Sequence, residues 1–262
     1  MHENYGYQYG FVSTKELDGE VRIGSGQFVS GYAIGILIQD VHYPLIPGNV
    51  ANASTFRYPV RMEIVKGANQ KRVHTYDETL LDELKAACKR LESQGVRAIT
   101  GACGYFGHFQ KEASKAVHIP MYLSSIMQIP WIRAGLRDDD EIGILCADIG
   151  CFTDHLFDQC GVGEEDKKRC RIAGAGNLAE FSALLERRGS FNNHALEGEL
   201  VSLAKELKLK YPRIRAILLE CSDMPPYAAA IQKAIQLPVY DYITMINFIY
   251  SSVAHRPFYG FI

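Results

Sequence analysis

Short apolar runs alternate along this chain with longer segments whose apolar residues recur at helical spacing. The runs are rich in β-branched residues, which favours buried parallel strands. They cover residues 33–38, 96–100, 119–123, 142–146, 169–173, 214–220 and 238–242. The helical patterns cover residues 75–95, 106–117, 153–160, 178–187, 196–207, 225–236 and 243–250. Because strands and helices alternate throughout, the sequence predicts an α/β fold with parallel sheets.

Two segments outside this alternation have a character of their own. Residues 41–58 contain Pro44, Pro47 and Gly48, which predicts a loop long enough to be functional. Residues 1–30 lack a clear period and are predicted to form an arm that packs on the body or on a partner subunit. Alternating aromatic residues in this arm (Tyr5, Tyr7, Tyr9 and Phe11) favour partial burial over a disordered tail. A capping box formed by Thr75 and Glu78 is predicted to open the helix over residues 75–95.

The chain repeats itself at long range, with a cysteine at the same place in each copy. Residues 96–99 (VRAI) lead to Cys103, and residues 214–217 (IRAI) lead to Cys221. Residues 34–37 and 142–145 repeat in the same way, and each ends shortly before an aspartate. Since the period is far longer than that of a solenoid repeat, the pattern predicts two pseudo-symmetric α/β domains derived from one duplicated unit.

The two matched cysteines, Cys103 and Cys221, are the candidate catalytic residues. Each follows a predicted strand and precedes a predicted helix, which is where ligands bind in parallel sheets. A helix N-terminus stabilises an anion, so we expect the pKa of both thiols to be lowered there. Two thiols on opposite faces of a cleft between the domains can exchange a proton at the carbon next to a carboxylate. Racemisation results, or elimination if the neighbouring carbon carries a leaving group.

The remaining cysteines and histidines show weaker patterns. Cys88, Cys146, Cys151, Cys160 and Cys170 are interpreted as small buried residues, since they lack the close pairing of zinc ligands. No histidine pair has metal-binding spacing, so no metal and no cofactor is expected. His108 lies about one turn beyond Cys103, where it could tune that thiol. The glycine run at Gly174 and Gly176 is interpreted as a turn from strand to helix.

Composition is that of an ordinary globular enzyme. The 262 residues are 47% hydrophobic and 22% charged, with a formal net charge of −2. This charge offers no attraction to nucleic acid or to an anionic membrane, and no apolar run is long enough to span a bilayer. The seven cysteines show no disulfide-framework spacing, and the first ten residues lack the features of a secretory signal. We therefore expect a cytoplasmic setting with free thiols.

The segments around the two cysteines carry a family resemblance. Residues 100–104 (TGACG) and 219–223 (LECSD) resemble the cysteine motifs of the aspartate/glutamate racemase superfamily. The resemblance covers residues 30–262 and implies two similar α/β domains, one catalytic cysteine from each, and no cofactor. It implies domain 1 at residues 31–130 plus 239–262, and domain 2 at residues 131–238. Gly104 and Tyr105 replace the usual Asn-Thr pair, which argues against an ordinary amino-acid substrate.

A second likeness points to a subgroup of that superfamily. Residues 39–44, 47–48, 103–106, 124–125, 221 and 225–228 resemble the algal dimethylsulfoniopropionate lyases, which eliminate dimethyl sulfide. Tyr43, Tyr105 and Phe106 would suit a sulfonium group by cation–π contact, and they would equally suit a core. The two likenesses together imply a set of substrate-binding residues: Asp40, Tyr43, Gly104, Tyr105, Ser124, Ser125, Thr153 and Ser222.

The sequence thus leaves several functions open. The first is a cofactor-independent racemase or isomerase of a small carboxylic or amino acid. The second is a carbon–sulfur lyase of the dimethylsulfoniopropionate type, because proton abstraction is common to both reactions. A non-catalytic small-acid-binding protein is a third possibility, and a decarboxylase is disfavoured because it would use a single cysteine. A homodimer or homotetramer is expected.

Overall fold

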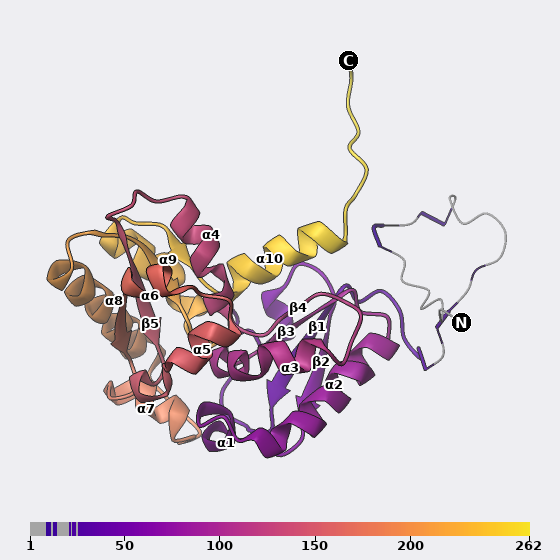
Figure 1. Cartoon of the computed structure of the whole chain (residues 1–262), viewed down its shortest axis with the longest axis horizontal. Helices are drawn as coiled ribbons and strands as arrows, with labels where there is room; N and C mark the ends of the chain where they lie inside the picture. The colour runs from indigo at the N-terminus through magenta and orange to yellow at the C-terminus, as the bar shows by residue number, and fades with distance from the viewer. Residues whose placement is uncertain (1–8, 12, 15–20, 22, 25) are drawn as a thin grey trace.

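A computed structural model gives the fold of the chain and describes residues 9–11, 13–14, 21, 23–24 and 26–262 (Figure 1). Two four-stranded parallel sheets form its centre, with strand orders β2-β1-β3-β4 and β6-β5-β7-β8. The first sheet contains β1 (Ile34–Gln39), β2 (Val60–Val65), β3 (Ala98–Gly101) and β4 (Met121–Tyr122). The second contains β5 (Glu141–Cys146), β6 (Cys170–Gly174), β7 (Ile214–Leu219) and β8 (Val239–Tyr240). The predicted α/β class with parallel sheets is confirmed.

The duplication extends to single hydrogen bonds beside the two cysteines. The amide of Ala102 donates to the carbonyl of Leu37, and the amide of Glu220 donates to the carbonyl of Leu145, each at 2.8 Å. Ala102 and Glu220 are the residues immediately before Cys103 and Cys221. The chain therefore leaves the central part of each sheet in the same way, which confirms the prediction of two similar units.

Ten α-helices and six short 3₁₀ helices are found within the described part of the chain. The α-helices are α1 (Gln70–His74), α2 (Leu81–Ser93), α3 (Gln110–Ser114), α4 (Ile129–Ala134), α5 (Asp154–Gln159), α6 (Glu164–Lys168), α7 (Ala179–Leu185), α8 (Asn193–Lys210), α9 (Ala228–Ile235) and α10 (Tyr242–Val253). The 3₁₀ helices are η1 (Ala53–Thr55), η2 (Glu78–Leu80), η3 (Gly104–Phe109), η4 (Ser125–Gln128), η5 (Ile149–Cys151) and η6 (Pro225–Tyr227).

Two clusters of buried apolar residues hold these elements together. The larger cluster spans both sheets, including Leu37 and Ile99 of the first and Ile144 and Ile217 of the second. The smaller one joins α10 to the first sheet, where Ile246 packs in the same cluster as β1. The last helix thus returns to the first sheet after the chain has built the second. The domain boundaries given above stay a prediction.

Two local predictions in the first unit are wrong. Strand β2 was not predicted, because it is an edge strand whose Arg61 and Glu63 interrupt its apolar residues. Thr75 does not open a helix: it is the C-cap of α1, and the side chain of Asp77 caps η2 instead by accepting a bond from the amide of Thr79. Helix α2 then begins at Leu81 and buries Leu84, Ala87, Cys88 and Leu91.

The helix predicted over residues 106–117 is shorter than expected. Its first part is the 3₁₀ helix η3, and only α3 is α-helical. The predicted strand over residues 238–242 is also shorter, because Asp241 caps α10 through a capping box with Thr244. In the arm, Tyr5 and Tyr7 lie outside the described residues. Tyr9 and Phe11 are 49% and 43% exposed, so the burial expected of them is at most partial.

A search of the described residues for helices that are long and apolar enough to cross a membrane finds none.

Candidate active site

The carboxyl ends of the central strands β1, β3, β5 and β7 lead into residues that line one small cavity. Its volume is about 30 Å³, enough for about two water molecules. The lining comprises Gln39, Tyr43, Gln70, His74, Cys103, Gly104, Tyr105, Ala147, Leu185, Glu220, Cys221, Ser222 and Asp223. Residues from both units thus meet in one cavity, as predicted for a site between two halves.

Six of the residues proposed from the sequence line this cavity, and four do not. Cys103, Cys221, Tyr43, Gly104, Tyr105 and Ser222 are in the lining, whereas Asp40, Ser124, Ser125 and Thr153 are not. Cys103 and Cys221 thus line the same cavity, and their roles in catalysis stay a prediction.

The four residues outside the lining bond to backbone groups instead. Asp40 Oδ2 accepts a bond from the amide of Gly67 at 2.8 Å. Ser124 caps η4, and Thr153 caps α5 by accepting from the amide of Leu156. The Ser125 hydroxyl donates to the carbonyls of Leu219 and Glu220, at 3.1 and 3.2 Å. Ser125 thereby ties one unit to the strand that carries the second cysteine.

The thiol of Cys103 sits at the start of η3. The backbone amides of Tyr105 and Phe106, in the first turn of η3, act to lower its pKa. Burial acts in the opposite direction and is the larger effect, and the charge of Glu220 adds to it, so the pKa of Cys103 is raised. The expectation of a lowered pKa is therefore wrong for this buried thiol, because loss of water outweighs a few amide dipoles at a short 3₁₀ helix.

Cys221 has a carboxylate partner two residues further on. The Cys221 Sγ lies 3.6 Å from Asp223 Oδ2, and the other oxygen of Asp223 accepts bonds from the Tyr43 hydroxyl, at 2.8 Å, and the Asn49 side-chain amide. Burial, with Asp223 and Glu220, raises the pKa of Cys221. Burial also raises the pKa of Asp223 itself, although Tyr43 and Asn49 oppose this. Asp223 is thus held in place by two residues of the 41–58 loop and is well prepared to accept a proton.

Glu220 is a site residue that the sequence analysis missed. Its side chain is fully buried, and burial raises its pKa to about 8. One oxygen accepts a bond from the amide of Ala147 at 3.2 Å, whereas Oε1 has no partner among the described residues. It lies so close to Gly104 that a Cβ at that position would overlap it. An acid placed directly between an apolar strand and a cysteine is the sequence signal that could have identified it.

The cavity lining carries acidic groups but no lysine or arginine. Glu220 and Asp223 are the carboxyl groups. The histidine in the lining, His74, has its pKa lowered to about 4 by burial and is therefore neutral near pH 7. The site thus suits a ligand whose second functional group is positively charged or neutral better than a ligand that carries two carboxylates.

Hydrogen bonds between the two units close the site. The Ser222 hydroxyl donates to the carbonyl of Ala102 at 2.9 Å, and the Tyr105 hydroxyl donates to the carbonyl of Asp148 at 2.6 Å. The amide of Val50, in the 41–58 loop, donates to the carbonyl of Ser222. The loop predicted to be functional therefore lies directly over the second cysteine.

His108 does not line the cavity. It is buried, stacks with His155 at a ring distance of 5.4 Å, and has its pKa lowered to about 4, mainly by burial. No bond between His108 and Cys103 is present, so its predicted influence on that thiol stays a prediction.

His74, Asp148 and Cys151 could hold a metal ion in the described part of the chain, since one ligand atom of each lies within 4.8 Å of the others. The Cys151 thiol donates to Asp148 Oδ2 at 3.3 Å. That bond accounts for the proximity of two of the three groups without a metal.

Comparisons with known proteins define the class and then the family. No protein-family profile matches the chain. Arylmalonate decarboxylase has a similar structure, with a TM-score of 0.56, 15% identity, and coverage of 87% of this chain and 97% of that one. Allantoin racemase from Pseudomonas fluorescens gives a TM-score of 0.54 at 16% identity, covering 87% of this chain and 99% of that one. The protein has the aspartate/glutamate racemase fold.

Relatives at higher identity narrow this class. The dimethylsulfoniopropionate lyase of Durusdinium sp. clade D is 30% identical over 234 residues, which cover 87% of this chain and 77% of that protein. Dimethylsulfoniopropionate lyase 5 of Emiliania huxleyi is 31% identical over 238 residues, but the match covers only 47% of that protein. The chain thus spans about half the length of this second relative. It belongs to the family of the dimethylsulfoniopropionate lyases.

Proposed function

We propose that this protein is a carbon–sulfur lyase that converts dimethylsulfoniopropionate into dimethyl sulfide and acrylate. The observation that carries the proposal is the charge of the cavity: the buried carboxyl group of Asp223 lines it, and no lysine or arginine does. A sulfonium cation suits such a site. The family membership adds independent support.

Both ends of this zwitterionic substrate find suitable groups in the lining. The sulfonium group would lie near Asp223 and the rings of Tyr43 and Tyr105, combining charge attraction with cation–π contact. The carboxylate would take hydrogen bonds from neutral donors. Gln39 is the best candidate, because its Nε2 is buried, lines the cavity, and has no partner among the described residues.

Cys221 is the proposed base, assisted by Asp223. Asp223 takes the proton of the Cys221 thiol, and the thiolate then removes a proton from the carbon next to the substrate carboxylate. The electron pair of that C–H bond forms the double bond of acrylate, while the C–S bond breaks and its pair leaves with sulfur. Dimethyl sulfide departs uncharged and needs no acid. Release of a proton from Asp223 to solvent restores the resting site.

The size of the cavity requires a movement during each turnover. A volume of about 30 Å³ is too small for a substrate of this kind. The 41–58 loop supplies Tyr43 and Asn49 to the site, so its displacement from Asp223 would open the cavity. Its return would exclude water and restore the bonds to Asp223.

Racemisation of a small acid is the second candidate, because both thiols line the same cavity. A racemase needs Cys103 as an acid on the opposite face of the substrate, whereas the elimination does not.

Incubation of the protein in deuterated water separates the two functions. With dimethylsulfoniopropionate, the lyase proposal expects dimethyl sulfide in the headspace and acrylate in solution, in equal amounts. A panel of amino acids and β-substituted propionates tests for deuterium uptake without elimination. Uptake into one of these, together with no release of dimethyl sulfide, would overturn the lyase proposal in favour of racemisation.

A further inference from the structure

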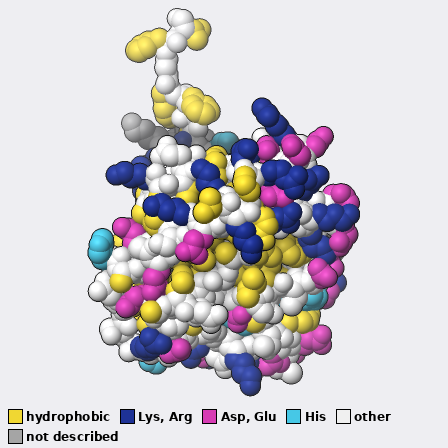
Figure 2. Space-filling model, turned by 90° about the vertical axis from the view of Figure 1, so that its left-hand side faces the viewer, with side chains coloured by type: hydrophobic (Ala, Val, Ile, Leu, Met, Phe, Trp, Pro, Cys, Tyr) yellow, Lys and Arg dark blue, Asp and Glu magenta, His cyan; other side chains and the backbone are white. Residues whose placement is uncertain are grey.

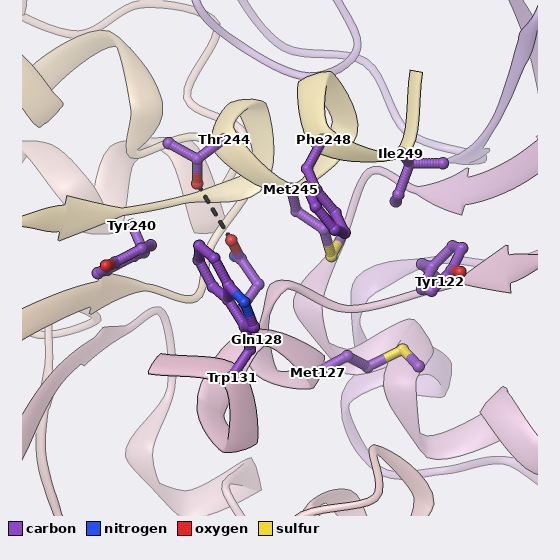
Figure 3. A pocket seen from close by; sticks show the side chains of 9 residues that line it. All are labelled: Tyr122, Met127, Gln128, Trp131, Tyr240, Thr244, Met245, Phe248 and Ile249. Atoms are coloured by element: carbon purple, nitrogen blue, oxygen red, sulfur yellow. Dashed lines mark hydrogen bonds between the residues drawn. The ribbon is translucent and has the colours of Figure 1, made fainter. Parts of the chain in front are cut away.

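An apolar groove lies on the surface, outside the candidate active site. It has a volume of about 190 Å³ and is formed by α4, β8, residues 244–249 of α10 and neighbouring residues (Figure 3). Trp131 and Phe248 contact each other in its lining at a ring distance of 5.9 Å, and they are 62% and 63% exposed. Tyr240 meets Trp131 edge-on. None of the nine lining residues is charged. A concave surface with large exposed aromatic side chains is typical of a protein contact.

The segment after α10 is also apolar and exposed. Residues 257–262 (PFYGFI) leave the body as an extended strand of chain (Figures 1 and 2). The side chains of Phe258, Tyr259, Phe261 and Ile262 are 99%, 89%, 106% and 129% exposed, the four highest values among the large exposed apolar residues apart from Phe28. Four such side chains on six residues are costly to leave in water. The segment therefore needs an apolar surface to cover it.

The residues just before this segment are anchored to the N-terminal arm. The amide of Phe11 donates to the carbonyl of His255 at 3.1 Å, and the guanidinium of Arg256 lies 4.1 Å from the centre of the Phe11 ring. Pro257 then disfavours a turn at Arg256, because the residue before a proline prefers an extended backbone. The chain is thus directed away from its own body.

We propose that the apolar groove binds residues 257–262 of a second copy of this chain. Both surfaces are free of charged residues and rich in aromatic side chains, so they match in chemistry. Six extended residues span roughly 20 Å, long enough to lay two or three side chains along a groove. Because the groove and the segment are both on every copy, a two-fold dimer would exchange two segments at once.

The geometry favours a second copy over the same copy. The groove lies along Thr244, Met245, Phe248 and Ile249 in the middle of α10, and the segment starts beyond Val253, where the helix ends. To reach its own groove the chain would have to reverse direction just after Pro257, because the contacts of His255 and Arg256 hold the preceding residues in place. A segment from a partner requires no such reversal.

The single tryptophan of the chain makes the test direct, because it is Trp131. The full chain is compared with a variant that ends at Arg256, by light scattering for mass and by tryptophan emission. We expect the full chain to be a dimer with emission at shorter wavelength, and the shortened chain to be monomeric with emission at longer wavelength. Adding a peptide of residues 255–262 to the shortened chain should restore the emission but not the mass.

Point variants sharpen this test. Phe261→Ser on the segment and Phe248→Ser in the groove should each raise the dimer dissociation constant about tenfold or more. Leu209→Ser is the control, since Leu209 is 83% exposed on α8, away from both surfaces, and should leave the dimer unchanged. An unchanged mass and emission after removal of residues 257–262 would overturn the proposal. A full chain that is monomeric and emits at the shorter wavelength at every concentration would also overturn the proposal, because the segment would then cover its own groove.

Discussion

Cys221 and Asp223 form a pair across a single intervening residue, with Sγ 3.6 Å from Oδ2. Asp223 is fixed in turn by Tyr43, which is 180 positions away in sequence. The arrangement gives the second cysteine a proton acceptor that is specific to it. Glu220 is the acid whose charge most raises the pKa of Cys103, and it is held by the amide of Ala147 and not by a tyrosine. The two halves are therefore alike in backbone but not in their proton chemistry.

Asp223→Asn should lower the rate of dimethyl sulfide release by about 10²–10⁴-fold, as expected when the partner of a general base is lost. The amide can still accept the bond from Tyr43, so the loop should keep its place. If Asp223 acts by taking the thiol proton, the rate of the variant should rise more steeply with pH than that of the natural protein, because it then follows the small fraction of Cys221 that is ionised, which burial keeps low. A variant with reduced activity but an unchanged pH profile would assign Asp223 a structural role only. The measurement is the initial rate of both proteins between pH 6 and about 10, a range that extends above the reference pKa of a free thiol.

Cys221→Ser should abolish turnover without unfolding the protein, since a serine hydroxyl is a far weaker acid and base. In a lyase with one base, Cys103→Ser should keep measurable activity, whereas in a racemase both variants should be inactive. Cys151→Ser is the control, because Cys151 is half-buried near the site but outside the cavity lining. Near-normal rates in Cys221→Ser would refute the proposed role of that thiol.

Glu220 should make the protein less stable as the pH rises. Its folded-state pKa, about 8, is above the value of about 4.5 that it has when unfolded, so the folded state binds the proton more tightly. That stabilisation is complete below about pH 4.5 and is lost as the pH rises through 8. Glu220→Gln keeps the shape without the charge, so its Tm relative to that of the natural protein should increase from pH 5 to pH 8. Parallel Tm curves for the two proteins would contradict the raised pKa.

Gly104→Ala should destabilise the protein by about 1–3 kcal/mol and impair the site, because the added Cβ would overlap the carboxyl group of Glu220 and approach its backbone oxygen within 2.8 Å. Gly198→Ala is the matched control: it lies in α8 and a Cβ there meets nothing within 4 Å. This control should instead stabilise the helix by about 0.5–1 kcal/mol. Urea unfolding gives the free energy of unfolding of both variants and of the natural protein. Equal values for Gly104→Ala and the natural protein would show that the side chain of Glu220 can move aside at little cost.

Treatment with a chelator should leave the activity unchanged, because the proposed chemistry uses only thiol and carboxyl groups. The group formed by His74, Asp148 and Cys151 makes this a real test. Dialysis against EDTA followed by assay is the measurement. Loss of activity that only an added metal restores, and that Cys151→Ser reproduces, would replace the thiol mechanism by one that needs the metal.

The sequence by itself determined the duplicated α/β architecture and the two cysteines. Both depend on local patterns: apolar strands, the helices between them, and a cysteine at the same place after β3 and β7. Such patterns involve residues that are close in sequence, so they can be recognised without knowledge of the tertiary structure. The same local reasoning failed at β2 and at Thr75, where an edge strand carries charges and a neighbouring aspartate supplies the cap.

Only the tertiary structure decided the electrostatics of the site. Whether a thiol gains or loses a proton more easily depends on how much water surrounds it, and burial here is produced by residues from both units. Asp223 became a partner of Cys221 because Tyr43 and Asn49 hold its carboxylate from a distant loop. Glu220 is buried because Gly104 leaves room for it. Contacts between residues that are far apart in the chain set these properties, and such contacts cannot be predicted from local sequence patterns.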